Sequence, residues 1–265
     1  MPKYICQACG VQHAESAAPP ARCIICEDPR QFVPESGQRW TTLERLQETY
    51  ANQFRGLAPG LTAISTIPTL AIGQRAFLVE TPAGNVLWDC ITLLDAATEA
   101  LIRARGGIKA IALSHPHYYG TMAAWGDAFG CPVLVHENDR DWVVEPAGRI
   151  EFWTGGQRDL LPGLTLHCLG GHFPGSCALH WSDRRILLPG DTFLVTRDQR
   201  HVSFMWSYPN YVPLPAEDVR RIADRLAGMD FDAIHSAFWG RGDIHSGGKA
   251  AIARSVTRHL NGPGI

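Results

Sequence analysis

The sequence predicts a layered α/β sandwich preceded by a small cysteine-rich module. Residues 1 to 38 are rich in Pro and Cys and show no helical periodicity. From about residue 60, strand-like segments come first, and helices and strands then alternate, which is typical of a layered fold. A Gly-x-Gly-x-x-Gly after a strand and a P-loop are both missing from the sequence, which argues against a doubly wound nucleotide-binding fold. We therefore expect two domains, residues 1–38 and residues 39–265.

The composition is that of a globular protein. Of the 265 residues, 45% are hydrophobic and 19% charged, and the net charge of −2 gives no electrostatic reason to expect nucleic acid or an anionic membrane as partner. No apolar run approaches the roughly 20 residues that span a bilayer, and the first residues lack the apolar stretch of a secretory signal. We expect a cytoplasmic protein that acts on a small-molecule substrate, and homo-oligomer formation stays open.

The hydrophobic periodicity predicts the order of the elements. A first short helix begins at Thr41 or Thr42 as N-cap and runs to about Gln53. Strands are predicted at residues 61–67, 76–79, 86–89, 108–113, 133–135, 151–152, 164–169, 177–181, 186–188 and 231–236. Further helices are predicted at residues 93–105, 121–129, 139–144, 216–229 and 249–260.

Four of the eight cysteines form two Cys-x-x-Cys pairs, Cys6 with Cys9 and Cys23 with Cys26. Two such turns provide a tetrahedral site of four sulfurs for Zn or Fe. The segment resembles the rubredoxin-like modules of rubrerythrins, in which Pro also precedes the second pair, although its spacer of 13 residues is shorter than in most zinc ribbons. We favour a structural zinc, with a redox iron as the alternative. The scattered cysteines are expected to be buried small hydrophobes (Cys90, Cys131, Cys168 and Cys177).

Three histidines and one carboxylate follow predicted strands. His115 and His117 come directly after the strand at 108–113, His172 lies in a Gly-rich loop, and Asp191 follows a short apolar segment. Side chains placed on loops at strand ends are a common way to build a site on a rigid scaffold. The sequence therefore indicates a candidate metal centre.

These segments resemble the metallo-β-lactamase-fold hydrolases, including the glyoxalase II-like branch. The resemblance rests on Ser-His-x-His, Gly-Gly-His-x-Pro-Gly-Ser and Gly-Asp-Thr, and it extends from about residue 60 to the C-terminus. It implies an αββα sandwich in which His115, His117 and His172 bind the first metal and Asp191 binds or bridges it. It also implies that Asp89, at the end of an early strand, supports the site indirectly.

The sequence departs from the family where a second metal would bind. The family pattern is His-x-His-x-Asp-His, but Tyr119 and Gly120 stand at its last two ligand positions. The family's final His is replaced by Phe238 or Trp239. All three ligands that bind only the second metal are absent, so we expect a single metal, Zn or Fe. His235 is interpreted as a structural residue of the last strand.

The expected function is a mononuclear metallo-hydrolase that acts on an ester, a thioester or a lactone-like molecule. Asp191 would orient the attacking water, and Tyr118 or Tyr119 would donate a hydrogen bond to the developing oxyanion or fill the vacated space. One alternative is a non-haem iron sulfur oxygenase with two His ligands and Asp191. The other is a non-catalytic, metal-stabilised binding protein whose aromatic side chains line an interface (Trp206, Tyr208, Tyr211, Phe238 and Trp239).

Overall fold

The computed structural model describes residues 1–262 and divides the chain into two compact units. The first unit contains residues 1–135 and 140–153, and the second contains residues 136–139 and the described residues from 154 onward. The predicted larger domain extends to residue 265, so its last residues, 263–265, lie outside the described part. The predicted domain boundary at residue 38 stays a prediction.

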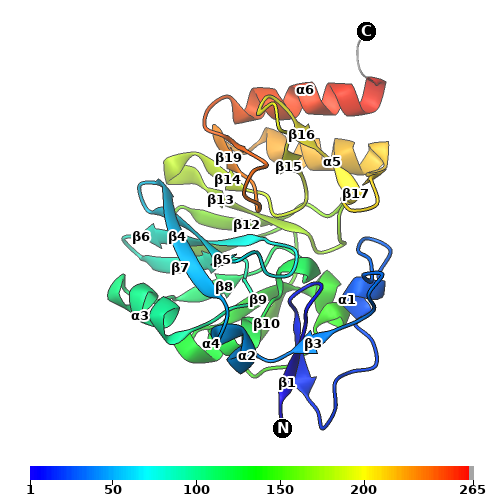
Figure 1. Cartoon of the computed structure of the whole chain (residues 1–265). Coiled ribbons are helices and arrows are strands. Elements are labelled where there is room, and N and C mark those ends of the chain that lie inside the picture. Colours follow the sequence, from blue (N-terminus) through cyan, green and yellow to red (C-terminus); the bar gives the residue numbers. More distant parts are fainter. Residues whose placement is uncertain (263–265) are drawn as a thin grey trace. The chain divides into compact units, whose positions relative to one another are not determined.

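The first unit is built on a seven-stranded sheet with the order β10-β9-β8-β7-β6-β5-β4 (Figure 1). Strands β4 to β7 are antiparallel neighbours, whereas β7, β8 and β9 run parallel. The parallel pairs bring the carboxyl ends of β7 and β8 to the same edge. The strands are β4 Ala51–Ala58, β5 Leu61–Ile67, β6 Arg75–Thr81, β7 Gly84–Trp88, β8 Ala110–Ala112, β9 Val133–His136 and β10 Ile150–Trp153.

The helices of the first unit bury apolar side chains against this sheet. Helix α3 (Ala96–Ala104) begins where the Asp95 carboxylate accepts a hydrogen bond from the Thr98 amide at 2.7 Å, which satisfies one unpaired amide of the first turn. Helix α4 (Met122–Phe129) ends at Gly130 in the left-handed conformation. Ile102 and Trp125 on these helices belong to the same buried cluster as several side chains of the sheet.

The N-terminal segment forms a small three-stranded sheet with the order β2-β1-β3. Its elements are β1 Lys3–Cys6, β2 Gln12–Glu15, α1 Ile24–Glu27 and β3 Trp40–Thr41, followed by α2 Leu43–Gln47. Val11 and Ile25 are buried in the cluster that also contains Ile64 and Leu78 of the large sheet. The cysteine-rich segment therefore shares one hydrophobic core with the first unit.

The second unit contains a six-stranded sheet with the order β11-β12-β13-β14-β19-β20. Helix α5 (Ala216–Ala227) packs Val219, Ile222 and Leu226 into a cluster with Leu187 of the sheet, and α6 (Gly248–Asn261) joins the same cluster. The sheet strands are β11 Gln157–Leu161, β12 Leu164–Cys168, β13 Cys177–Trp181, β14 Ile186–Leu188, β19 Ala233–His235 and β20 Asp243–Ile244. Two ribbons pair β15 Leu194–Val195 with β16 Val202–Ser203, and β17 Met205–Ser207 with β18 Val212–Pro213.

Several segments differ from the sequence-based expectation. Short strands that were not expected form the N-terminal sheet, the two ribbons and β20, and the helix predicted at residues 139–144 is a 3-10 helix at Glu137–Trp142. The helix predicted to reach Gln53 ends at Gln47, because the following residues form β4 and pair along β5 from Ala51 opposite Ile67 to Ala58 opposite Leu61. Strand pairing thus overrides a local helical pattern. Strand β11 was not expected, because its polar sequence Gln-Arg-Asp lacks the alternation of a half-buried strand.

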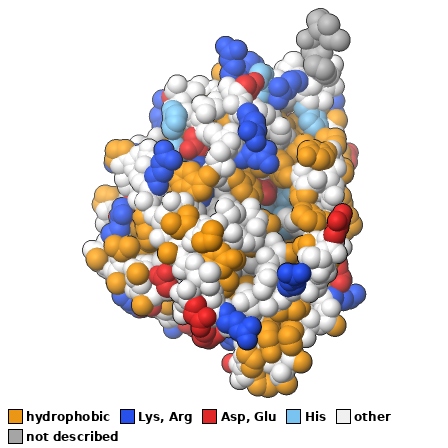
Figure 2. All heavy atoms as spheres, viewed as in Figure 1, with side chains coloured by type: hydrophobic (Ala, Val, Ile, Leu, Met, Phe, Trp, Pro, Cys, Tyr) orange, Lys and Arg blue, Asp and Glu red, His pale blue; other side chains and the backbone are white. Residues whose placement is uncertain are grey.

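Basic side chains are spread over the face shown in Figure 2, and several Lys and Arg side chains lie near its top. In the second unit, Arg200, His201 and Arg254 give a hollow of ≈ 390 Å³ a basic lining. Asp198 lies 3.0 Å from the His201 ring and offsets part of this charge. Within residues 1–262, no helix has the length and apolar character needed to cross a membrane.

Candidate metal centres

The loop that carries the first two candidate histidines is tied to two neighbouring strand ends. Asp89 follows β7 in a left-handed conformation, and its amide donates a hydrogen bond to the Ala112 carbonyl at 2.9 Å. Its carboxylate accepts a hydrogen bond from the Ser114 amide at 2.7 Å. Asp89 therefore has the supporting position that the sequence indicated, since it fixes the residue directly before His115.

His115 and His117 lie close together in the first unit. Their ring centroids are 5.0 Å apart with an interplanar angle of 73°, and both side chains are buried. The Ser114 hydroxyl lies 2.9 Å from Nδ1 of His115, and the Tyr118 ring packs on the same imidazole with centroids 4.4 Å apart. A hydrogen bond at one ring nitrogen fixes an imidazole so that the other nitrogen can act as a metal ligand.

Tyr119 and Gly120 serve packing in this loop. Tyr119 belongs to the hydrophobic cluster of the first unit. Gly120 has φ of +49°, and a Cβ atom on it would lie 2.9 Å from the Ile91 carbonyl oxygen. Its own carbonyl accepts a hydrogen bond from the Gln12 amide at 2.9 Å. Gly120 therefore occupies a position without room for a side chain, and the catalytic roles suggested for Tyr118 and Tyr119 stay predictions.

His172 lies in the second unit, in the loop between β12 and β13. Gly171 before it has φ of +86°, and a Cβ there would come within 2.9 Å of Leu214, so glycine permits this close turn. Nδ1 of His172 lies 3.2 Å from the Met205 carbonyl oxygen, to which an N–H at that nitrogen donates. This tautomer presents Nε2 as the lone-pair nitrogen, which is the form that binds metals.

Asp191 follows β14 in the second unit, and its carboxyl group is buried. Burial and, next, the negative charge of Asp191 raise the pKa of Tyr208 well above its ordinary value. The Tyr208 hydroxyl donates a hydrogen bond to the Ser203 carbonyl at 2.9 Å, and its ring centroid lies 5.7 Å from that of His172. Sequence reasoning had placed Tyr208 only in a general aromatic group, because nothing local to it signals proximity to His172.

His235 is held within the second sheet. Its Nδ1 lies 3.2 Å from the Asp243 carboxylate, and the two residues face each other in the pairing of β19 with β20. The other Asp243 oxygen accepts a hydrogen bond from the Ser236 amide at 3.0 Å. This arrangement agrees with the structural role that was expected for His235.

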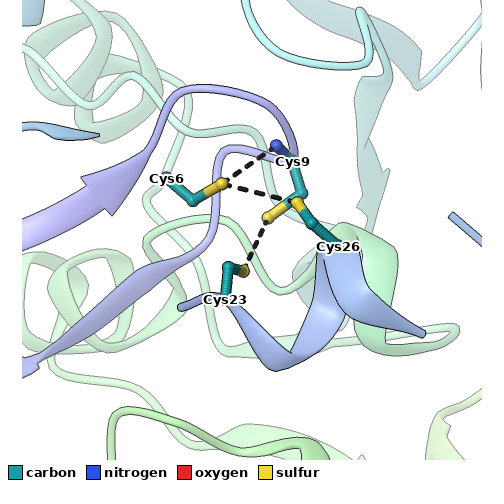
Figure 3. A group of neighbouring side chains, drawn as sticks. All are labelled: Cys6, Cys9, Cys23 and Cys26. Carbon is teal, nitrogen blue, oxygen red and sulfur yellow. Dashed lines mark hydrogen bonds between the residues drawn. The ribbon is translucent and has the colours of Figure 1, made fainter. Parts of the chain in front are cut away.

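The four N-terminal cysteines converge in the first unit, with their sulfur atoms all within 4.8 Å of one another (Figure 3). The sulfurs of Cys6 and Cys26 are 3.5 Å apart, and those of Cys9 and Cys23 are 3.7 Å apart. Four thiolates at about 2.3 Å from a tetrahedral zinc lie about 3.8 Å from one another, so the observed spacing fits such an ion. All four side chains are buried.

Hydrogen bonds around the sulfurs favour the thiolate form of Cys6 and Cys23, whereas hydrogen bonds from Cys23 raise the pKa of Cys9 and of Cys26. The Cys9 amide donates to the Cys6 sulfur at 3.5 Å, and the Gln38 side-chain amide donates to the same sulfur at 2.9 Å. The pKa of the Cys23 thiol is lowered, chiefly by a hydrogen bond from Cys26. Thiolates are the metal-binding form of cysteine, and a bound cation would stabilise all four in that form.

Three hydrogen bonds, which we call the knuckle seam, join the cysteine segment to the histidine loop. The Thr92 hydroxyl donates to the Gly10 carbonyl at 3.0 Å, and the Thr121 hydroxyl donates to the Thr92 carbonyl at 2.9 Å. The third is the bond from the Gln12 amide to the Gly120 carbonyl. The cysteine cluster thus braces the loop that begins at His115.

Each unit is a mixed α/β sheet structure, and the first unit holds a group of four cysteines that suits a metal ion. The family model of the metallo-beta-lactamase superfamily matches residues 71–237. The chain belongs to this superfamily.

Relatives and solved structures agree with this assignment. The chain is 45% identical over 266 residues to the uncharacterized protein YmaE of Bacillus subtilis, covering 98% of this chain and 96% of YmaE. It is 26% identical over 136 residues to the probable metallo-hydrolase YybB of the same organism, covering 44% of this chain and 62% of YybB. The metallo-beta-lactamase FIM-1 from Pseudomonas aeruginosa, solved in a mono-zinc form, is 15% identical with a TM-score of 0.57 over 79% of this chain and 94% of FIM-1. This last likeness shows the fold alone.

Proposed function

We propose that the protein is a hydrolase with one catalytic metal ion, held by His115, His117, His172 and Asp191, and that the cysteine cluster holds a second, structural ion. One observation carries the proposal: each of these four side chains is buried and follows a strand of the superfamily fold. Buried histidines and carboxylates of this kind are stabilised by binding a cation. The proposed substrates are esters, thioesters and lactone-like molecules.

A single catalytic ion is supported by the packing around the histidine loop. In the family pattern, an Asp and a His that bind the second metal stand where this chain has Tyr119 and Gly120. Tyr119 contributes to the hydrophobic core, and Gly120 lies against the Ile91 carbonyl with no space for a side chain. The residues at these positions therefore stabilise the loop and supply neither a carboxylate nor an imidazole.

The residues of the site would divide the chemistry among them. A bound zinc polarises a carbonyl group and lowers the pKa of its water to about 7. The Ser114 hydroxyl and the Met205 carbonyl hold the rings of His115 and His172 in fixed orientations. Asp191 would orient the attacking water and accept its proton, and the Tyr118 hydroxyl would donate a hydrogen bond to the oxyanion of the tetrahedral intermediate.

The metal content per chain tests the ligand assignment. Protein purified without added metal or chelator is expected to contain two metal ions per chain, and His172→Ala is expected to contain one. His201→Ala is the matched control, because His201 pairs with Asp198 on the surface and should leave both ions in place. If His172→Ala retains both ions, the assignment is wrong. Iron in place of zinc would shift the function to the oxidative sulfur chemistry of the alternative.

Activity is then measured on a panel of thioesters and lactones. Tyr118→Phe should lower kcat by about 10²–10³-fold while leaving the metal content unchanged, because it removes one oxyanion donor. If the metal-loaded protein hydrolyses no substrate in the panel faster than the metal-free protein does, the hydrolase proposal is wrong.

A further inference from the structure

A pair of cysteines outside both metal sites lies face to face in the second unit. Cys168 ends β12 and Cys177 begins β13, and the two are direct partners in the antiparallel pairing of these strands. Both side chains are buried, and neither is in a disulfide. The pair therefore has a geometry that a packing role alone does not require.

The register of the strands places the two sulfurs where a bond could form. The Cys168 amide donates to Gly156 on the side of β11, and the next cross-strand bond runs from the Leu169 amide to the Ser176 carbonyl at 2.8 Å. Cys168 and Cys177 are thus a non-hydrogen-bonded pair, in which the Cα atoms are about 4.5 Å apart. A disulfide accepts Cα separations of about 4.4–6.8 Å, so it can form without moving the strands.

The chemical environment favours the thiolate form of one member of the pair. The pKa of Cys168 is lowered to about 5, first by a hydrogen bond from Cys177, and the His136 ring and the charge of Arg225 add to this effect. The Arg225 guanidinium also donates to the Cys168 carbonyl. The Cys177 thiol lies within reach of the Gly175 carbonyl as well, at 3.0 Å. An acidic thiol beside a second thiol is the arrangement of reactive dithiols.

We infer that Cys168 and Cys177 form a redox-active dithiol, a modification site that a peroxide converts into a cross-strand disulfide. The Cys168 thiolate attacks the peroxide, the O–O bond breaks, and a sulfenic acid forms while the leaving oxygen takes up a proton as water. The Cys177 sulfur then attacks the sulfenic sulfur, the S–S bond forms, and a second water leaves. Two thiols lose two electrons and two protons, and the peroxide is reduced.

Oxidation would act on the loop that carries His172. The disulfide joins the two ends of residues 169–176 and closes them into a covalent ring. A cross-link of this kind limits the conformations of the enclosed loop. The inference does not depend on the hydrolase proposal, because it concerns the thiols themselves and is tested without any substrate.

Peptide mapping tests the inference on the metal-loaded, full-length protein. Trypsin releases residues 159–184 as one peptide that contains both cysteines, whereas Cys90 and Cys131 fall on separate peptides. These two are internal controls, since they are buried and burial raises the pKa of both thiols. The protein is treated with hydrogen peroxide and then with an alkylating reagent. The 159–184 peptide should then have lost two hydrogens and carry no alkyl group. Its oxidation should be at least about ten times faster than that of either control cysteine. A reductant should restore alkylation.

Two single variants identify the thiol that is attacked first. In Cys177→Ser, a sulfenic-acid trap such as dimedone should label Cys168, and in Cys168→Ser it should leave Cys177 unlabelled. If Cys168 and Cys177 of the peroxide-treated native protein are alkylated to the same extent as Cys90 and Cys131, the inference is wrong. Over-oxidation of Cys168 without a disulfide would also overturn it. The native-protein result decides the matter even if a variant fails to fold.

Discussion

Substitution of Gly10 by alanine tests how tightly the cysteine segment is joined to the first unit. Gly10 has φ of +80°, and a Cβ there would lie 2.1 Å from the Thr92 hydroxyl and 3.0 Å from Ala71. Gly37 is a matched control, because its φ of +82° is nearly the same and a Cβ on it would have no atom within 4 Å. The two variants share the backbone strain and differ only in the contact.

The expected magnitudes follow from this difference. The left-handed conformation costs an alanine about 1–2 kcal/mol, so Gly37→Ala should lower the free energy of unfolding by that amount. Gly10→Ala must also rotate or displace Thr92 and break its bond to the Gly10 carbonyl. Leaving a buried polar group unsatisfied costs about 1–3 kcal/mol more, which gives about 2–5 kcal/mol in total.

Urea unfolding of both variants, loaded with the same metal, measures the two free energies. The knuckle seam predicts a second effect, because a displaced Thr92 also loosens its carbonyl bond from Thr121 and hence the histidine loop. Gly10→Ala should therefore retain less metal at the histidine site than Gly37→Ala does. Equal unfolding free energies for the two variants would refute the reasoning, since the contact with Thr92 would then carry no energy.

Three further predictions concern the seam, the cysteine site and a buried histidine. Thr92→Val should lower the free energy of unfolding by about 1–3 kcal/mol in urea titrations, whereas Thr92→Ser, which keeps the hydroxyl, should retain most of the stability. Removal of metal by a strong chelator should lower the midpoint temperature of thermal unfolding. The same midpoint with and without the chelator would argue against a structural ion in the cysteine cluster. Burial, followed by the charge of His180, lowers the pKa of His167 to about 4 from its usual 6.5. The unfolded chain therefore takes up this proton first, and stability should fall as the pH drops from about 6.5 through 4. Across this pH range, the free energy of unfolding of His167→Gln should depend less on pH than that of the native protein.

Local sequence patterns predicted the features that depend on neighbouring residues. The strand that ends before His115, the glycine-rich turn before His172 and the supporting Asp89 were all expected from motifs. They could be found because a buried strand, a glycine turn and a polar residue at a strand end each leave a signal within a few positions. The convergence of Cys6, Cys9, Cys23 and Cys26 was expected from spacing alone.

Features that depend on distant pairing were not predictable in the same way. The segment from Ala51 becomes a strand because β5 offers it a partner, and its own sequence does not require this. The Asp243 partner of His235 comes from a neighbouring strand, and Tyr208 lies beside His172 only because the short ribbon of β17 and β18 places it there. These contacts are set by tertiary packing, for which a single sequence contains no periodic signal.

The packing of Gly120 restricts how this protein can change over evolutionary time. A histidine tolerates the φ of this residue, but its Cβ would still meet the Ile91 backbone oxygen at 2.9 Å, and a backbone atom cannot rotate away as a side chain can. The Gln12 amide, bonded to the Gly120 carbonyl, holds the glycine in place from the other side. One mutation therefore cannot supply the family's missing imidazole. Because the cysteine segment packs against this loop, several simultaneous changes would be needed to make room for an imidazole here.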